Sequence, residues 1–187
     1  MKIDRRKKGF LLIEAMLATI FLVSGVVAII PLISFSLREA IDSRDQVIAG
    51  MLAQEGAELV QNLRDDNWVQ LPEKKAFESN FPLNSATNCR LDYNDSTVST
   101  CDSSSKALSL NGNGFYSHDG GGTATKFQRK IELKFTPDNN MTATKLEVVS
   151  VVLWKAGNFP TDPISVTNCN TLSKCAFTKT TLTNWRP

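Results

Sequence analysis

The sequence is short of the residues on which much enzyme chemistry depends. It has one histidine, His118, among its 187 residues, and its four cysteines include no Cys-x-x-Cys pair. Catalytic triads assemble from positions that lie apart in the sequence, so the adjacent Ser117 and Asp119 do not make one with His118. We interpret His118 as an exposed loop residue, and we expect no enzyme, no cofactor and no zinc site.

Charge is almost missing from one long stretch near the N-terminus. Glu14 is the only charged residue between Gly9 and Arg38, and residues 15–37 have none. About 20 apolar residues suffice to cross a bilayer as a helix. Residues 10–37 are therefore expected to be a transmembrane helix, too long for the apolar core of a signal peptide and retained in the protein.

The flanking charges predict how this segment lies in the membrane. Residues 1–9 carry five basic side chains and one acidic side chain. Basic flanks stay on the cytoplasmic side, so residues 38–187 are expected outside the cytoplasm. Removing residues 1–9 from the totals of 21 basic and 19 acidic residues leaves 16 and 18, a net charge of −2. This balance argues against a broad basic surface for nucleic acid.

Glu14 is costly in such a segment. A lone carboxylate at the bilayer centre costs about 2.5–3.5 kcal/mol on the insertion scale, and a position near the membrane surface reduces that cost. One interpretation is an interfacial residue with no role. The other is that Glu14 neutralises a positive charge that lies close to it in an apolar setting.

The stretch 9–14, Gly-Phe-Leu-Leu-Ile-Glu, resembles the cleavage and methylation motif of type IV prepilins and type II secretion pseudopilins. The resemblance implies that residues 1–9 are a leader, which a membrane peptidase removes between Gly9 and Phe10. It also implies N-methylation of Phe10. The free amine of Phe10 would then pair with the Glu14 carboxylate of a neighbouring subunit as a filament assembles.

The same resemblance implies a fold and a set of partners. The pilin fold is α+β: a long N-terminal helix, half transmembrane and half amphipathic, packs on an antiparallel β-sheet head. Pro31 lies where many pilins have a helix-distorting proline. The implied partners are other pilin subunits, the prepilin peptidase and methyltransferase, the pilus assembly platform and, before assembly, membrane lipid. Residues 52–68 resemble the minor-pilin branch related to pilus modification proteins and minor pseudopilins.

Three functions remain open at this point. The first is a type IV pilin-like structural subunit, a minor one, held in the inner membrane and then in a surface pilus. The second is a minor pseudopilin of a type II secretion system. The third is a membrane-anchored binding domain outside the cytoplasm that never assembles.

Residues 38–66 have the periodicity of an amphipathic helix. Their larger apolar residues recur mainly at spacings of four and seven, which predicts one buried face: Ile41, Val47, Ile48, Met51, Leu52, Leu59, Val60 and Leu63. Gly50 and Gly56 are expected to permit the close approach of another element. Residues 65–67, Asp-Asp-Asn, are expected to end the helix.

Alternation of apolar and polar residues predicts the strands of the head. It favours strands over 127–135, 146–154 and 176–185, with a hairpin loop at 138–140. Arg129 departs from the apolar face of the first strand and is expected at that strand's end. The basic residues of this region are expected on a solvated sheet surface: Lys126, Arg129, Lys130 and Lys134.

The four cysteines lie in the predicted head, residues 67–187, in a compartment that permits disulfides. Four cysteines allow three pairings. The local pairs Cys89–Cys101 and Cys169–Cys175 are favoured because each brackets a polar loop. Calcium has weaker support, since the loops at 92–95 and 138–139 offer oxygen ligands without the order of an EF-hand.

Overall fold

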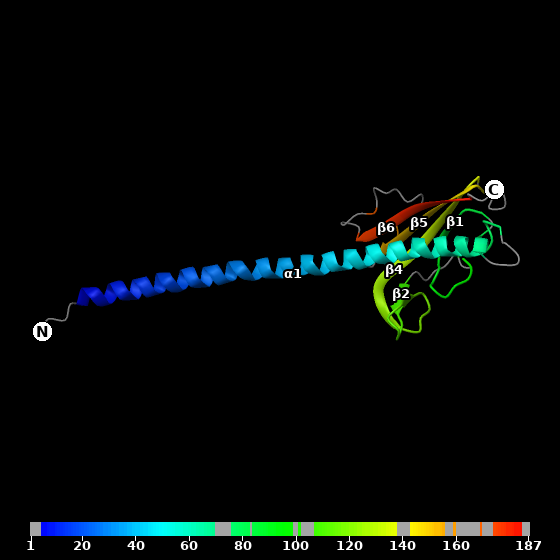
Figure 1. The fold of residues 1–187 in the computed structure, drawn as a ribbon. Helices are drawn as coiled ribbons and strands as arrows, with labels where there is room; N and C mark the ends of the chain where they lie inside the picture. Colours follow the sequence, from blue (N-terminus) through cyan, green and yellow to red (C-terminus); the bar gives the residue numbers. More distant parts are fainter. Residues whose placement is uncertain are drawn as a thin grey trace. The chain divides into compact units, whose positions relative to one another are not determined.

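A computed structural model describes the chain over residues 5–69, 76–82, 84–98, 101, 107–137, 143–155, 159, 169 and 174–184, with side chains from residue 12 onward. One helix is followed by six strands (Figure 1): α1 (Arg5–Val69), β1 (Ala86–Cys89), β2 (Ala107–Leu110), β3 (Tyr116–Ser117), β4 (Thr123–Thr136), β5 (Lys145–Leu153) and β6 (Cys175–Thr183).

The chain divides into two compact units, Met1–Arg44 and Asp45–Pro187. The division falls inside α1, so the outer part of the helix, from Asp45 to Val69, belongs to the same unit as the sheet. The predicted boundaries at Gly9, at 37/38 and at 66/67 stay predictions.

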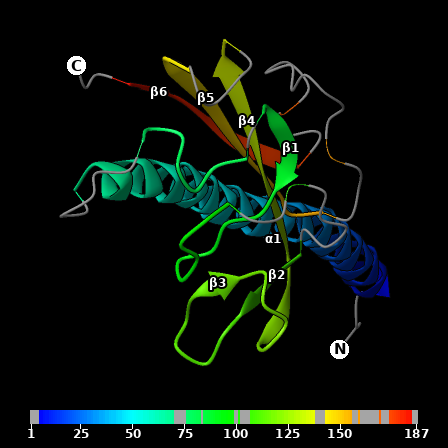
Figure 2. The same cartoon turned by 90° about the vertical axis from the view of Figure 1, so that its right-hand side faces the viewer.

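The six strands form one antiparallel sheet with the order β3-β2-β4-β5-β6, and β1 also pairs with β4. The 14-residue strand β4 is long enough to pair with β2 in its first half and with β1 in its second half. Figure 2 shows these partners at opposite ends of β4. The three predicted strands appear as β4, β5 and β6, and the predicted α+β fold class is confirmed. A long N-terminal helix on an antiparallel sheet fits the pilin architecture.

Every second side chain along the strands faces the outer part of α1. These side chains pack against the helix and form the core of the head. Phe127, Val152 and Leu108 pack with Ala49, Leu52 and Ala53 near the start of that part. A larger cluster continues toward the end of α1, and its members come from the helix, the loop after it and the long strands: Val60, Leu63, Trp68, Phe77, Phe81, Ile131, Leu133, Phe135, Leu146 and Val148. The opposite face carries a smaller cluster around Val151 and Leu153.

The buried face of α1 differs from the prediction. Ile41, Val47 and Met51 are exposed, whereas the residues that meet the sheet are mostly small: Ala49, Leu52, Ala53, Gly56, Ala57, Val60 and Leu63. The sheet lies close to the helix, so small side chains are needed along the contact. The predicted buried face of the helix was therefore partly wrong, because the prediction relied on the larger apolar residues.

The helix also ends later than predicted, at Val69. Asn67 is fully buried, and its side-chain amide donates to the Ser79 carbonyl at 2.5 Å and accepts from Asn80 at 2.8 Å. Trp68 stacks against Phe77 with ring centroids 6.2 Å apart. These tertiary contacts hold a last turn that the Asp-Asp-Asn sequence alone would not favour.

Gly56 permits the close approach that the sequence predicted, whereas Gly50 does not. A Cβ at Gly56 would collide with the Ser150 hydroxyl and would lie 3.1 Å from Cδ of Arg129. A Cβ at Gly50 would meet nothing within 4 Å. The missing side chain at Gly56 therefore makes room for the sheet and for the stem of Arg129.

Two disulfides join residues near each other in the chain. Cys89 is bonded to Cys101 and Cys169 to Cys175, which are the two local pairs that the sequence favours. The first bond lies at the end of β1 and the second at the start of β6, so each ties a loop to an edge of the sheet.

We predict that alanine has opposite effects at the two helix glycines. Gly50→Ala should stabilise the protein by about 1 kcal/mol through helix propensity. Gly56→Ala gains the same propensity but overpacks the contact with Ser150, which costs about 1–3 kcal/mol. A net loss of about 1 kcal/mol is expected at Gly56. Thermal unfolding of the full chain in detergent micelles measures both, and equal stabilisation by the two variants would contradict the close packing.

Candidate functional site

The apolar segment of α1 leaves its side chains uncovered. Every large apolar residue from Leu12 to Leu37 is exposed, with 51 to 73% of its surface accessible. A helix that is apolar all round needs lipid or other helices to cover it. The helix is long and apolar enough to cross a membrane, so this segment can serve as a membrane anchor.

Two hydroxyl groups of this segment find their partners within the helix itself. The Thr19 hydroxyl donates to the Met16 carbonyl at 2.8 Å, and the Ser24 hydroxyl donates to the Phe21 carbonyl at 2.9 Å. Both groups are thus satisfied within the helix, as an apolar environment requires. Pro31 lies inside the helix without ending it, which fits its predicted place but does not show a distortion.

Glu14 is the one charged group of this segment. It lies on α1 with an exposed side chain and makes no hydrogen bond or ion pair with another described residue. Gly9 and Phe10 lie in the same helix, but the Phe10 side chain is outside the described part. Phe10 and Glu14 are four positions apart in the sequence, which is about 6 Å along a helix and on the same face.

The head contains a second polar arrangement, centred on Arg129. Its side chain is fully buried, which corrects the prediction that Arg129 lies at a strand end: it pairs with Val152 well inside β4. One guanidinium nitrogen donates to Glu55 at 3.0 Å and to the Leu52 carbonyl at 3.4 Å. The position faces the helix, where these acceptors take the place of apolar packing.

The other terminal nitrogen of Arg129 reaches the loop after β1. It donates to the Leu91 carbonyl at 2.9 Å and to Oδ1 of Asp92 at 3.3 Å. A buried cation is tolerated only when acceptors surround it, and here they come from α1 and from a loop about 38 residues away in the chain. Arg129 therefore fastens the helix, the sheet and this loop to one another.

His118 belongs to the same cluster, which corrects its prediction as an exposed loop residue. Its side chain is 2% exposed, with Nδ1 2.7 Å from Oδ1 of Asp92. Its main-chain N–H donates to Oδ2 of Asp92 at 2.8 Å. A carboxylate only accepts hydrogen bonds, so Nδ1 carries the hydrogen. The interaction joins the segment after β3 to the loop after β1 and holds the His118 ring inside the head.

These contacts change the acidity of Asp92. Burial alone would raise the pKa of its carboxyl, but the hydrogen bonds and the charge of His118, together with the charge of Arg129, outweigh burial and hold the pKa below its ordinary value. The carboxylate form of Asp92 is therefore the form that the fold favours.

The four basic residues that were predicted to share a solvated sheet surface do not lie on the same face. Lys126 pairs with Asp45 of α1, and Arg129 is buried on the helix side. Lys130 is buried on the opposite side of the sheet, 2.6 Å from Glu132, because alternate residues of β4 face opposite ways. Lys134 is exposed and lies across from Glu147 of β5.

Metal binding has no support among the described residues, where no three potential ligands of the histidine, cysteine or carboxylate kind lie together. In the first calcium candidate, residues 92–95, the carboxylates already have protein partners. Asp92 contacts Arg129 and His118, and the Asp95 carboxylate accepts the main-chain N–H of Asp92 at 2.8 Å. The second candidate, at 138–139, lies outside the described residues.

In comparisons with known proteins, the chain matches no protein-family model, no curated protein and no solved structure.

We predict that Asp92 matters far more to stability than an exposed carboxylate. Asp92→Asn leaves Arg129 short of a buried counter-charge and should cost about 3 kcal/mol. Glu147→Gln is the control, because Glu147 pairs with Lys179 at 2.7 Å on the surface, where such pairs contribute about 0–1 kcal/mol. Urea unfolding followed by tryptophan fluorescence measures the difference. Equal losses for the two variants would contradict a structural role for the cluster.

The acidity of Asp92 also predicts a pH dependence. Since the folded pKa lies below the ordinary value of 3.8, the unfolded chain binds more protons in acid. The contribution of Asp92 to stability is present above about pH 4 and is lost as the pH falls through the folded pKa. Unfolding measured from pH 2 to 6 should show this acid loss weakened in Asp92→Asn. An unchanged acid profile in that variant would contradict it.

Proposed function

We propose that this chain is a type IV pilin-like structural subunit, a minor one, that is processed after Gly9, methylated at Phe10 and assembled into a surface pilus through α1. The observation that carries the proposal is Glu14: the one charge between Gly9 and Arg38, exposed in the otherwise apolar part of α1 that ends at Leu37. A minor pseudopilin of a type II secretion system would use the same helix and the same chemistry.

The chemistry of this site explains why an acid is retained there. Cleavage after Gly9 would create an ammonium group at Phe10, within or beside the membrane. An isolated buried charge costs several kcal/mol, whereas an amine and a carboxylate from adjacent helices satisfy each other. The pair forms only at one axial offset between the helices, so it also selects the register of assembly.

The rest of the molecule supports the same proposal. The exposed apolar surface from Leu12 to Leu37 would be covered by lipid before assembly and by neighbouring helices afterwards. The outer part of α1 is fastened to the head through Arg129, so a helix held among other helices would carry the head with it. The implied order is insertion in the inner membrane, processing, and extraction into the filament.

We predict that Glu14→Ala inserts and is processed but enters filaments at least about tenfold less well, because the amine of the neighbouring Phe10 loses its counter-charge. Glu39→Gln is the matched control, since Glu39 is an exposed acid of α1 beyond the apolar run. The ratio of chain in sheared surface fibres to chain in membranes measures incorporation. Wild-type incorporation of Glu14→Ala, or absence of the wild-type chain from all fibres, would contradict the proposal.

A further inference from the structure

The ring of His118 lies at a break in the strand pairing along one edge of β4. On that edge β2 pairs as far as Gln128, and the pairing with β1 starts at Ile131. Nε2 of His118 lies 3.3 Å from the main-chain carbonyl oxygen of Arg129, which falls between these two pairings. The imidazole therefore occupies a place that a main-chain N–H of a partner strand fills elsewhere in the sheet.

Both ring nitrogens of His118 face hydrogen-bond acceptors. Nδ1 lies 2.7 Å from Oδ1 of Asp92, and Nε2 faces the Arg129 carbonyl oxygen. A neutral imidazole has one N–H and one bare nitrogen, so only the imidazolium donates from both. In a neutral ring the bare nitrogen would face an oxygen lone pair, and the ring is too deeply buried, at 2% exposure, to find water instead. The geometry thus fits the doubly protonated ring.

The charges around the ring also favour the imidazolium. Oδ1 of Asp92 accepts from both His118 and the Arg129 guanidinium, and that guanidinium also lies 3.0 Å from Glu55 of α1. With a charged ring the cluster contains two cations and two carboxylates. A neutral ring would leave one negative charge in excess inside the head, which is costly.

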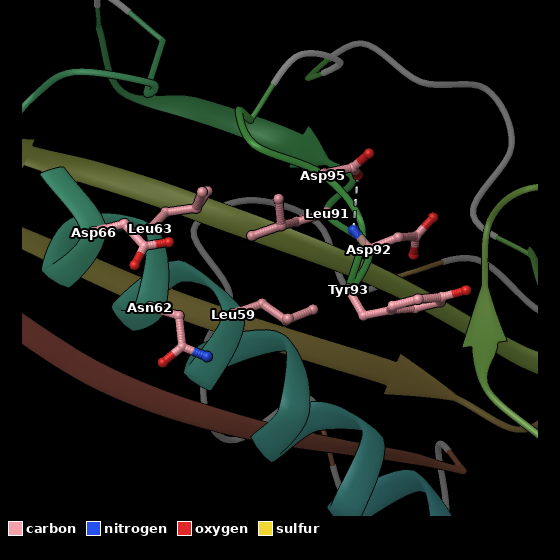
Figure 3. A pocket seen from close by; sticks show the side chains of 8 residues that line it. All are labelled: Leu59, Asn62, Leu63, Asp66, Leu91, Asp92, Tyr93 and Asp95. Atoms are coloured by element: carbon pink, nitrogen blue, oxygen red, sulfur yellow. Dashed lines mark hydrogen bonds between the residues drawn. The ribbon is translucent and has the colours of Figure 1, made fainter. Parts of the chain in front are cut away.

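The other charged groups of the surrounding segments do not oppose this state. Asp95 lies in the same turn as Asp92, and Figure 3 shows its carboxylate accepting the Asp92 main-chain N–H, beside a small pocket next to α1. Asp119, which follows the histidine in the chain, is exposed. Lys126 and Lys130 of β4 are each paired with a carboxylate. The nearby acids add negative charge, which favours a cation at the ring.

We propose that His118 is held as an imidazolium and acts as a pH-sensitive latch between β4 and the segment after β3. When Nε2 releases its proton to solvent, this nitrogen changes from a donor to an acceptor and is repelled by the Arg129 carbonyl oxygen. Residues 117–119 then lose their bond to β4, while Nδ1 keeps its bond to Asp92. The latch concerns the head alone and does not depend on cleavage at Gly9 or on filament assembly.

The sign of the pH dependence follows from where the proton is bound. Because the folded head holds the second proton of His118, the contribution of the latch to stability is present in mild acid and is lost as the pH rises. The contribution of Asp92 has the opposite sign and is lost in strong acid. The head should therefore be most stable between the two titrations.

The composition of the chain lets this titration be assigned to one residue. His118 is the only histidine, and all four cysteines are in disulfides. Among the remaining side chains none ordinarily titrates between about pH 6 and pH 9. The amine of the first residue does titrate there, but it belongs to the N-terminal unit rather than to the head.

The first test is NMR of the full chain in neutral detergent micelles, with nitrogen-15 in its histidine. At pH 6 both ring nitrogens should carry a hydrogen. Between pH 6 and pH 9 Nε2 should lose its hydrogen while Nδ1 keeps its own, and the amide shifts of residues 117–119 and 129–130 should follow the same curve. A bare ring nitrogen at pH 6, or amides that stay fixed while the ring titrates, would overturn the proposal.

The second test compares thermal unfolding of His118→Gln and the wild type at pH 6 and pH 9. The wild-type midpoint should fall by about 3–6 °C, whereas the variant, which cannot titrate, should change by less than about a third of that. Asp119→Asn is the matched control, because its exposed side chain has no part in the latch, and it should fall as the wild type does. A wild-type midpoint that does not fall, or an equal fall in His118→Gln, would overturn the proposal. If His118→Gln does not fold, the NMR titration of the wild type decides alone.

Discussion

The head depends on one buried guanidinium. Arg129 sits on the helix-facing side of the central strand and reaches Glu55 on α1 and Asp92 in the loop after β1. Asp92 in turn binds His118, so one charge cluster joins four segments: α1, the loop after β1, the segment after β3, and β4. Gly56 leaves the space that the Arg129 stem crosses. Because a buried cation is costly without its acceptors, displacing any one of these segments would destabilise the head.

The two units of the chain differ in whether their energetically costly groups, buried charges and exposed apolar side chains, have partners. The head buries Arg129 and Asp92 and pairs these two charges with each other and with Glu55 and His118. In the N-terminal unit, the large apolar side chains from Leu12 to Leu37 are exposed, and Glu14 has no partner among the residues that the structure describes. Lipid can cover the apolar side chains, but it cannot neutralise an acid. A second helix that brings a positive charge does both, which is the physical reason for interpreting this unit as an assembly element.

The sequence predicted what depends on local periodicity. The apolar helix and the strands β4, β5 and β6 follow from spacing, and the cysteine pairs follow from their proximity in the chain. The buried face of α1 was partly wrong, because close packing selects Ala and Gly over Val47 and Met51. The buried position of Arg129 could have been predicted, because the residue places a charge at an inward-facing position of an apolar strand face. Its partners could not be predicted, since Glu55 and Asp92 come near only in the folded chain.

We propose that α1 is cut after Gly9, which exposes an amine at Phe10 that pairs with Glu14 of a neighbouring subunit. The most direct measurement is mass spectrometry of the N-terminal peptide, taken from the full-length gene product in cells with an active prepilin peptidase. The account predicts a peptide that begins at Phe10 and carries one N-methyl group. A chain that retains residues 1–9 in those cells would contradict the account.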